Sequence, residues 1–189
     1  MKILVEEDIW GFDLCTALEE ISSQRRDQAL KFKYEEGRRL CVLAYRLLKQ
    51  ALRDEFGFEG NPLFEYNAHG KPSIVGHPEF HFNLSHCKEA VVCVVSHQPV
   101  GIDVEVIREH KEDLVRYTMN DDEVRQVEAA IFPATAFIRL WTMKEATLKL
   151  DGKGIIDDLK HVIDPERIHY TTIERPKYVY TIAEYRFDC

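Results

Sequence analysis

Apolar residues recur with helical spacing in the first third of the chain. The pattern over residues 13–31 predicts one helix, and a stronger amphipathic pattern over residues 36–56 predicts a second. Gly57 and the turn formed by residues 60–62 end this second helix, because glycine and proline interrupt a helical run. The opening residues, 1–8, are read as a first strand.

From Leu63 onward the period changes to two, which predicts short strands. Four strand-like segments follow one another: residues 63–66, 80–84, 90–96 and 100–107. A turn cluster at residues 67–72 separates the first two. The short connection at residues 97–99 predicts a hairpin between the last two strands. We expect the boundary between two lobes near this connection, which divides the chain into residues 1–98 and 99–189.

The second half returns to helix and then to strand. Two polar segments, residues 112–118 and 121–130, predict helices. Asn120 is the expected cap of the second helix. Pro133 separates them from a helix over residues 137–149, and Asp151-Gly152 ends that helix. Aromatic and β-branched residues predict the last strands: residues 161–164, 168–174 and 178–187. Both halves therefore run from helix to antiparallel strands, which predicts an α+β fold with two similar lobes.

The composition is that of a soluble globular protein. The chain has 189 residues, 45% of them hydrophobic and 31% charged. No apolar run approaches the roughly 20 residues that a membrane-spanning helix needs, and the first residues lack the features of a signal peptide. Five cysteines form an odd set without a Cys-x-x-Cys pair, and Cys41 and Cys93 lie in apolar runs. We therefore expect a reduced, cytoplasmic protein.

The charge distribution limits the ligands that the chain can bind. A net charge of −8 argues against general affinity for nucleic acid or an anionic membrane. Any phosphate ligand must then be held by a local group of basic residues or by a metal. One such group lies between residues 25 and 39: Arg25, Arg26, Lys31, Lys33, Arg38 and Arg39. This segment is either a solvated helix surface or an anion-binding rim.

Two carboxylates alternate along the predicted strand over residues 100–107. Asp103 and Glu105 face the same way, about 6–7 Å apart, and such a pair repels unless a positive charge lies between them. Their oxygens are hard ligands that suit Mg²⁺, and Glu145 could complete the site. A strand with a solvated face is the simpler alternative.

The helix over residues 137–149 places three side chains on one face. Trp141, Glu145 and Lys149 recur at intervals of four residues. The pair formed by Glu145 and Lys149 could be an ordinary surface ion pair worth about 0.2–0.5 kcal/mol. Combined with the strand carboxylates and with Lys144, the same residues suit phosphoryl chemistry.

Two other kinds of site, a zinc site and a nucleophilic serine, are disfavoured. His77, His81 and His86 are closely spaced, but no cysteine partner or His-Glu-x-x-His motif accompanies them, which disfavours a zinc site. A nucleophilic pair of Ser85 and His86 is disfavoured because adjacent strand residues point to opposite faces.

Five segments in order resemble a known family. Gly101-Ile-Asp-Val-Glu105 and the segment from Leu140 to Lys149 resemble the two-part signature of the 4′-phosphopantetheinyl transferases, of the monomeric surfactin-synthetase-activating type. Further matches are Gly70-Lys-Pro72, Phe80-His-Phe-Asn-Leu-Ser-His86 and Gly152-Lys-Gly-Ile155, so the resemblance covers roughly residues 20–160. The sequence departs from the family at Cys87-Lys88, where Ser-Gly is usual. The chain is also short after the last motif, so we expect a smaller sheet in the second lobe.

The resemblance implies a pseudo-dimer of two α+β lobes with coenzyme A in the cleft between them. It implies that Asp103, Glu105 and Glu145 are the Mg²⁺ ligands, and that Lys149 lies near the coenzyme A phosphates. Lys144 would orient the carboxylates or touch phosphate. In addition to Asp103 and Lys149, the resemblance implies coenzyme A contacts from Arg39, Lys71, Pro72, Ser85 and His86. Arg25 and Lys31 correspond to basic positions of the family in a looser alignment.

The implied reaction is Mg²⁺-dependent transfer of the 4′-phosphopantetheine arm of coenzyme A to a serine of an apo acyl or peptidyl carrier protein, releasing 3′,5′-ADP. Glu145 would accept the serine proton, and Lys149 would stabilise the developing negative charge. We expect a monomer. A non-catalytic coenzyme A or carrier-protein binding module is the alternative, and a metal-dependent nuclease fits the acidic chain poorly.

Overall fold

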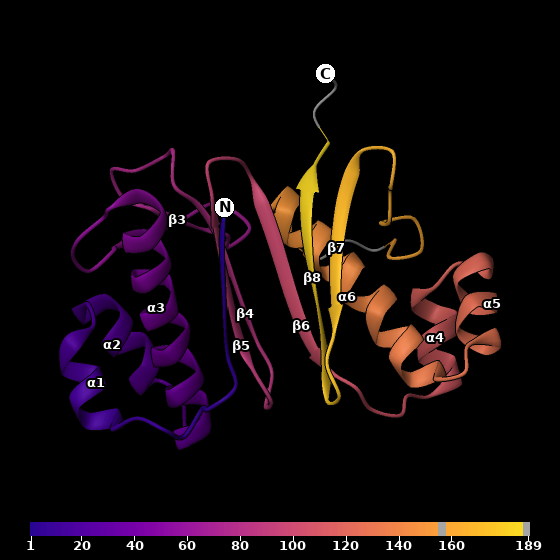
Figure 1. Ribbon diagram of the computed structural model, residues 1–189, viewed down its shortest axis with the longest axis horizontal. Helices are drawn as coiled ribbons and strands as arrows, with labels where there is room; N and C mark the ends of the chain where they lie inside the picture. The colour runs from indigo at the N-terminus through magenta and orange to yellow at the C-terminus, as the bar shows by residue number, and fades with distance from the viewer. Residues whose placement is uncertain (155–157, 187–189) are drawn as a thin grey trace.

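The computed structural model describes residues 1–154 and 158–186, and it is a mixture of helices and antiparallel strands (Figure 1). The helices are α1 (Leu14–Glu20), α2 (Ser23–Leu30), α3 (Glu35–Phe56), α4 (Glu112–Thr118), α5 (Asp121–Ala129) and α6 (Pro133–Asp151). The strands are β1 (Lys2–Glu6), β2 (Phe64–Tyr66), β3 (Pro72–Ile74), β4 (His81–His86), β5 (Val91–Ser96), β6 (Val100–Val106), β7 (Ile168–Glu174) and β8 (Tyr178–Tyr185). The predicted α+β class is confirmed.

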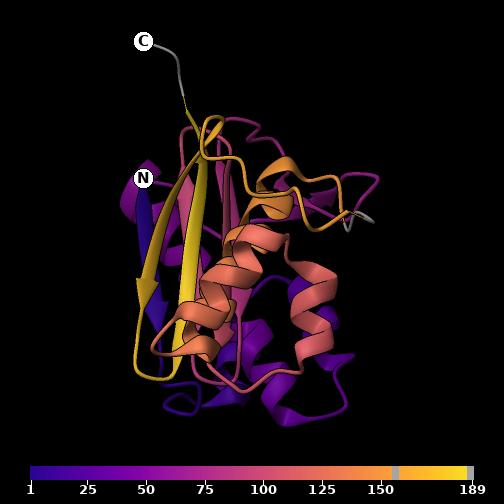
Figure 2. The same ribbon diagram turned by 90° about the vertical axis from the view of Figure 1, so that its right-hand side faces the viewer.

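Two three-stranded antiparallel sheets form the centre of the molecule. One has the order β1-β5-β4 and the other β6-β8-β7, while β2 and β3 form a small separate ladder. Helix α3 packs on the first sheet, and α6 packs on β6 and β8 of the second. In Figure 2 the strands lie on one side, with α6, α4 and α5 on the other. Each sheet is therefore stabilised by one long helix.

The two sheets meet along β4 and β6. These strands are in contact but belong to different sheets. Side chains bridge them: Asn83 Oδ1 accepts from the Ile102 N–H at 3.0 Å, and Ser85 Oγ accepts from the Val104 N–H at 3.3 Å. Buried backbone donors need such partners, because an unpaired one costs free energy comparable to a lost hydrogen bond. This seam places β4 beside the carboxylates of β6.

Most of the long elements agree with their predicted bounds. The helix expected over residues 36–56 is α3, and both polar helices are present. Asn120 caps α5 in a capping box, with its Oδ1 accepting from the Glu123 N–H. Gly152, at a φ of 65°, ends α6 in the left-handed conformation that glycine adopts readily. Cys41 and Cys93 are buried in the core, as expected.

Three local predictions are wrong. The helix expected over residues 13–31 is two helices, because Ser22 breaks the run and its Oγ caps α2 by accepting from the Arg25 N–H. Residues 97–99 do not join a hairpin: β5 pairs with β1 and β4, so neither of its edges is free for β6. Residues 161–164 form no strand; His161 lies in a turn beside Asp158.

The remaining differences concern short segments. Strand β3 was not predicted, because three residues are too few to show a period of two; its first residue, Pro72, was placed in the turn cluster. Ile155, Phe187 and Cys189 lie outside the described residues, so the expectations that involve them are not addressed.

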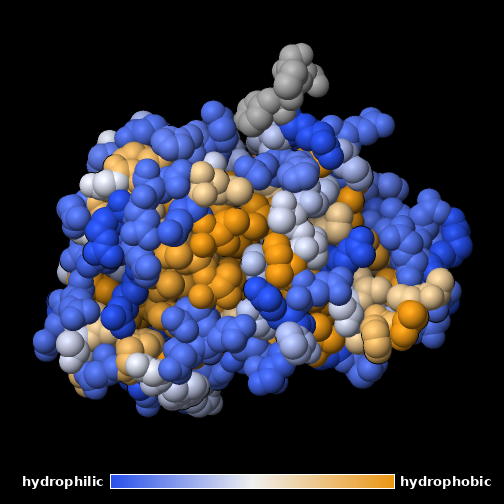
Figure 3. Space-filling view, viewed as in Figure 1, coloured by the Kyte–Doolittle hydropathy of each residue, from blue (hydrophilic) through white to orange (hydrophobic). Residues whose placement is uncertain are grey.

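An exposed apolar area lies around β1. Figure 3 shows an orange area around β1, where Val5 is exposed and its neighbours in the strand are only half-buried. Within residues 1–154 and 158–186, no helix is long and apolar enough to cross a membrane. Apolar side chains are also exposed elsewhere, Ile131 and Phe132 among them.

Gly101 allows α6 to approach β6 closely. A Cβ at this position would lie inside contact distance of the Ala146 carbonyl oxygen and 2.6 Å from the Leu150 backbone nitrogen. Both atoms belong to the helix backbone and cannot rotate away. We expect Gly101→Ala to lower the free energy of unfolding by about 1–3 kcal/mol, measured by urea denaturation. An unchanged free energy would contradict this close packing.

Candidate functional site

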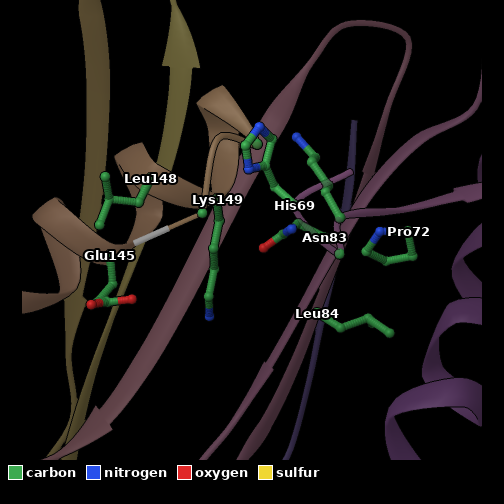
Figure 4. Close-up of a pocket in the computed structure, with 11 residues that line it drawn as sticks. His69, Pro72, Asn83, Leu84, Glu145, Leu148 and Lys149 are labelled. Atoms are coloured by element: carbon green, nitrogen blue, oxygen red, sulfur yellow. The ribbon is translucent and has the colours of Figure 1, made fainter. Parts of the chain in front are cut away.

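A pocket of about 290 Å³ lies between α6 and the segment that carries β3 and β4. In Figure 4, Glu145, Leu148 and Lys149 project from α6 on one side, while Pro72 and Leu84 lie on the other. The full lining is His69, Gly70, Lys71, Pro72, Asn83, Leu84, Glu145, Leu148, Lys149, Gly152 and Gly154. Residues about 80 positions apart in sequence therefore form one cavity.

Lys149, Asp103 and Ser85 form a hydrogen-bonded cluster beside this pocket. The Lys149 Nζ lies 2.6 Å from Asp103 Oδ1 and donates to Ser85 Oγ at 2.9 Å. The Ser85 hydroxyl donates in turn to Asp103 Oδ1 at 2.9 Å. Asp103 is only 4% exposed and Glu105 is half-buried, so this strand face is not a fully solvated one. Lys149 pairs with Asp103, so it does not form the ordinary surface ion pair with Glu145 that was the alternative.

The negative charge of the carboxylates at the site is not fully balanced by hydrogen bonds and cations. Asp103 Oδ2 is buried and has no hydrogen-bond partner among the described residues. Burial, followed by the charge of Asp103, raises the pKa of Glu105 and also that of Glu145. Glu105 and Glu145 thus both lie close enough to Asp103 for its charge to disfavour their ionisation, and Lys149 is a nearby cation that opposes this effect.

This charge imbalance fits a hard divalent cation. Carboxylate oxygens are the ligands that Mg²⁺ prefers, and an unpartnered buried oxygen on Asp103 is available to one. In the described part of the chain, however, no three His, Cys, Asp or Glu side chains already converge as a metal-binding group. The donor set therefore fits the chemistry of the ion, although the carboxylates do not form a closed ligand cage.

The pocket also contains part of the predicted phosphate-binding set. Lys71 and Pro72 line it. The Lys71 Nζ donates to the Leu150 carbonyl at 2.9 Å, and burial lowers the pKa of this lysine. His86 keeps an exposed surface, yet burial of the rest and then the charge of Lys149 lower the pKa of its imidazole. These residues lie where an anionic ligand beside Lys149 could reach them.

Three predicted basic residues lie outside the pocket lining. The Arg25 guanidinium donates to the Cys41 carbonyl at 2.9 and 3.1 Å, although its charge still helps to lower the pKa of His86. Arg39 binds the Glu35 carboxylate at 2.8 Å and the carbonyl of Phe12 at 2.9 Å. Lys31 is exposed at the end of α2. Their predicted contact with the ligand remains a prediction.

The role expected for Lys144 is wrong. Its side chain is buried and pairs with the Glu123 carboxylate at 2.8 Å, and it donates to the Leu159 carbonyl at 2.8 Å. Each helix residue turns by about 100° from the one before it, so Lys144 faces α5 while Glu145 faces the pocket. Lys144 therefore joins α6 to α5 and does not orient the carboxylates.

We expect Lys144→Met to destabilise the fold by about 3–5 kcal/mol, because it leaves the buried Glu123 carboxylate without its cation, with only the Asn120 N–H still donating to it. Chemical denaturation measures this loss. The double variant with Glu123→Gln, which keeps a capping side chain for α5, should recover much of it. Equal stability of the single and double variants would contradict the pairing.

Sequence patterns missed several residues of the site. Asn83 and Leu84 were quoted only as part of a motif, and His69 was treated as part of a turn. A signal was present for Asn83: a polar residue inside an apolar strand needs a buried partner, which here is the Ile102 N–H. His77, by contrast, lies outside the pocket lining and stacks on Phe80 at a centroid distance of 4.6 Å.

Comparisons with known proteins match part of this chain to one family. Residues 99–184 match the family model described as the 4′-phosphopantetheinyl transferase superfamily. This range contains Asp103, Glu105, Glu145 and Lys149.

Similar curated proteins are bacterial. The chain is 33% identical over 138 residues to the 4′-phosphopantetheinyl transferase psf-1 of Bacillus pumilus, covering 71% of this chain and 59% of that protein. It is 28% identical over 138 residues to the 4′-phosphopantetheinyl transferase Sfp of Bacillus subtilis, covering 71% and 62%. It is 39% identical over 97 residues to the 4′-phosphopantetheinyl transferase gsp of Aneurinibacillus migulanus, covering 50% and 40%. The chain thus spans about three fifths of the length of the first two proteins.

Proposed function

The resemblance to the 4′-phosphopantetheinyl transferase superfamily is confirmed, and from this premise we propose that the chain transfers the phosphopantetheine arm of coenzyme A to a carrier-protein serine. The observation that carries the proposal is the meeting of Lys149, Asp103 and Ser85 beside a pocket that Glu145 also lines. A lysine for phosphate, acidic groups for a cation and a carboxylate base are the parts that phosphoryl transfer needs.

Asp103, Glu105 and Glu145 would hold Mg²⁺. The support is the unpartnered Asp103 oxygen and the raised pKa values of the two glutamates, which reflect burial and then the charge of Asp103. Bound there, Mg²⁺ supplies positive charge that offsets the negative charge of the coenzyme A pyrophosphate.

Glu145 and Lys149 would act on the reacting groups. The serine oxygen attacks the β-phosphorus of coenzyme A, the bond from that phosphorus to the bridging oxygen of the pyrophosphate breaks, and 3′,5′-ADP leaves. Glu145 takes the serine proton, and its raised pKa, caused first by burial, makes it a better base near neutral pH. The Lys149 ammonium would stabilise the negative charge that develops on the leaving phosphate.

The 3′-phosphate and adenosine end of coenzyme A would lie toward β3 and β4. Lys71, Pro72, Ser85 and His86 are the proposed contacts nearest the pocket. To reach a phosphate, Lys71 would exchange its present bond to the Leu150 carbonyl for a charged acceptor. The more distant basic side chains proposed for the same end are Arg25, Lys31 and Arg39.

The architecture supports two related lobes, residues 1–98 and 99–189, as a pseudo-dimer. Each half contributes a three-stranded antiparallel sheet and one long helix packed on it, α3 in the first and α6 in the second. The pocket has walls from both halves. Because a pseudo-dimer supplies both sides of its own cleft, we propose a monomer that works in the cytoplasm on coenzyme A and an apo carrier protein.

Mass spectrometry of carrier proteins tests the proposal. The purified protein is incubated with coenzyme A, Mg²⁺ and several apo carriers, with and without a chelator. We expect one phosphopantetheine on the carrier serine, and no product when the chelator is present. Coenzyme A binding without any mass gain would favour a non-catalytic binding module. Absence of coenzyme A binding would contradict the proposal altogether.

A further inference from the structure

Asn67 organises the loop that forms one wall of the pocket. Its Oδ1 accepts from the backbone N–H groups of His69 and Lys71, both at 2.9 Å. Its own backbone N–H donates to the Lys71 carbonyl at 3.0 Å, and its carbonyl accepts from the Gly70 N–H at 3.0 Å. One asparagine therefore fixes the loop over residues 67–71, in the manner of the Asx turns that this residue type favours.

The same side chain ties the loop to the end of α6. Asn67 Nδ2 donates to the Gly152 carbonyl at 3.0 Å, across 85 residues of sequence. Beside it, Lys71 Nζ donates to the Leu150 carbonyl. The last carbonyls of a helix have no partner within the helix and carry its partial negative charge. The loop thus supplies donors that α6 lacks at its C-terminus.

This tie joins the two walls of the pocket. His69, Gly70 and Lys71 line it from the loop, while Glu145 and Lys149 line it from α6. The contact is close: a Cβ on Gly152 would lie 2.7 Å from the Lys71 side chain. The position of the loop on α6 therefore sets the separation of Lys71 from Lys149.

We propose that Asn67 is a positioning residue for the polyphosphate donor, since it holds Lys71 at a fixed distance from Lys149. The inference rests on the proposed function of the pocket. When Lys71 leaves the Leu150 carbonyl to bind a phosphate, the bond from Asn67 to Gly152 still holds the loop on the helix. Asn67 acts through Lys71 and does not itself touch the ligand.

The Asn67 side chain accepts from the loop N–H groups and donates to the Gly152 carbonyl, and Asn67→Asp removes only the second bond. The aspartate keeps an oxygen for the loop N–H groups but replaces the donor to Gly152 with a carboxylate oxygen, which repels the carbonyl. We expect the Kd for coenzyme A, measured by titration calorimetry, to rise about tenfold. The KM for coenzyme A should rise while kcat changes less. Asn67→Ala, which also removes the loop bonds, should raise the Kd further.

Asn120→Asp is the matched control. Asn120 Oδ1 also accepts from a backbone N–H, that of Glu123, and its Nδ2 also donates to a distant carbonyl, that of Lys160 at 3.2 Å. It lies outside the pocket lining. We expect this control to leave the Kd unchanged. A normal Kd in Asn67→Asp, or an equal loss in Asn120→Asp, would overturn the inference.

Hydrogen exchange separates this inference from the proposed function. Asn67→Asp should speed amide exchange over residues 67–71 and 148–154, and unchanged exchange there would overturn the tie whether or not coenzyme A binds. A parent protein that fails to bind coenzyme A would instead overturn the proposed function.

Discussion

Asp103→Ala is expected to reduce the rate of phosphopantetheine transfer by roughly 10³-fold or more. The substitution removes the carboxylate that binds Lys149 at 2.6 Å and the buried oxygen that has no other partner in the described part of the chain. Both the cation site and the orientation of the lysine depend on this side chain. Lys149 is partly exposed and can turn to solvent, so the fold should persist.

The measurement is the initial rate of carrier modification, with circular dichroism to confirm that the variant is folded. Asp113→Ala, on the exposed side of α4, is the matched control and should keep the parental rate. Full activity in a folded Asp103→Ala protein would contradict the assignment of the site.

Glu145→Gln is expected to lower kcat by roughly 10²–10⁴-fold. The glutamine has almost the same shape but is not a base, and it replaces one of the three proposed charged cation ligands with a neutral oxygen. The ion pair of Asp103 with Lys149 would remain, so the fold and the pocket shape should be kept.

Calorimetry and kinetics together test the Glu145 prediction. A loss in kcat with coenzyme A binding retained would support its role as the base. Glu166→Gln, in an exposed loop, should change neither quantity. If Glu145→Gln turned over at the parental rate, another group would have to accept the serine proton.

The sequence predicts those elements whose pattern depends on local spacing. Helix α3 shows a long amphipathic repeat, and its observed bounds differ from the prediction by one residue. The connection between β5 and β6 was misread because strand pairing depends on the whole sheet. All residues of β5 are buried, because alternate residues pack into two different hydrophobic clusters, one with α3 and the other with β6 and β8.

The site likewise has features that local spacing predicts and features that it does not. The alternation of Asp103 and Glu105 and the spacing of Glu145 and Lys149 follow from strand and helix geometry, so the residue types of the site could be predicted. The partners could not. Lys149 bonds to Asp103, which lies 46 residues earlier, and Asn67 bonds to Gly152 across 85 residues. Such bonds depend on how the sheets and helices pack, which a local pattern does not encode.

The most direct measurement of the central claim is the stoichiometry of a single transfer reaction. The parent protein is mixed with coenzyme A, Mg²⁺ and one apo carrier, and the 3′,5′-ADP released and the carrier serine modified are both quantified. Transfer predicts one mole of 3′,5′-ADP for each mole of phosphopantetheinylated carrier, and neither product with Asp103→Ala. Release of 3′,5′-ADP without carrier modification, or coenzyme A left intact with every carrier, would contradict it.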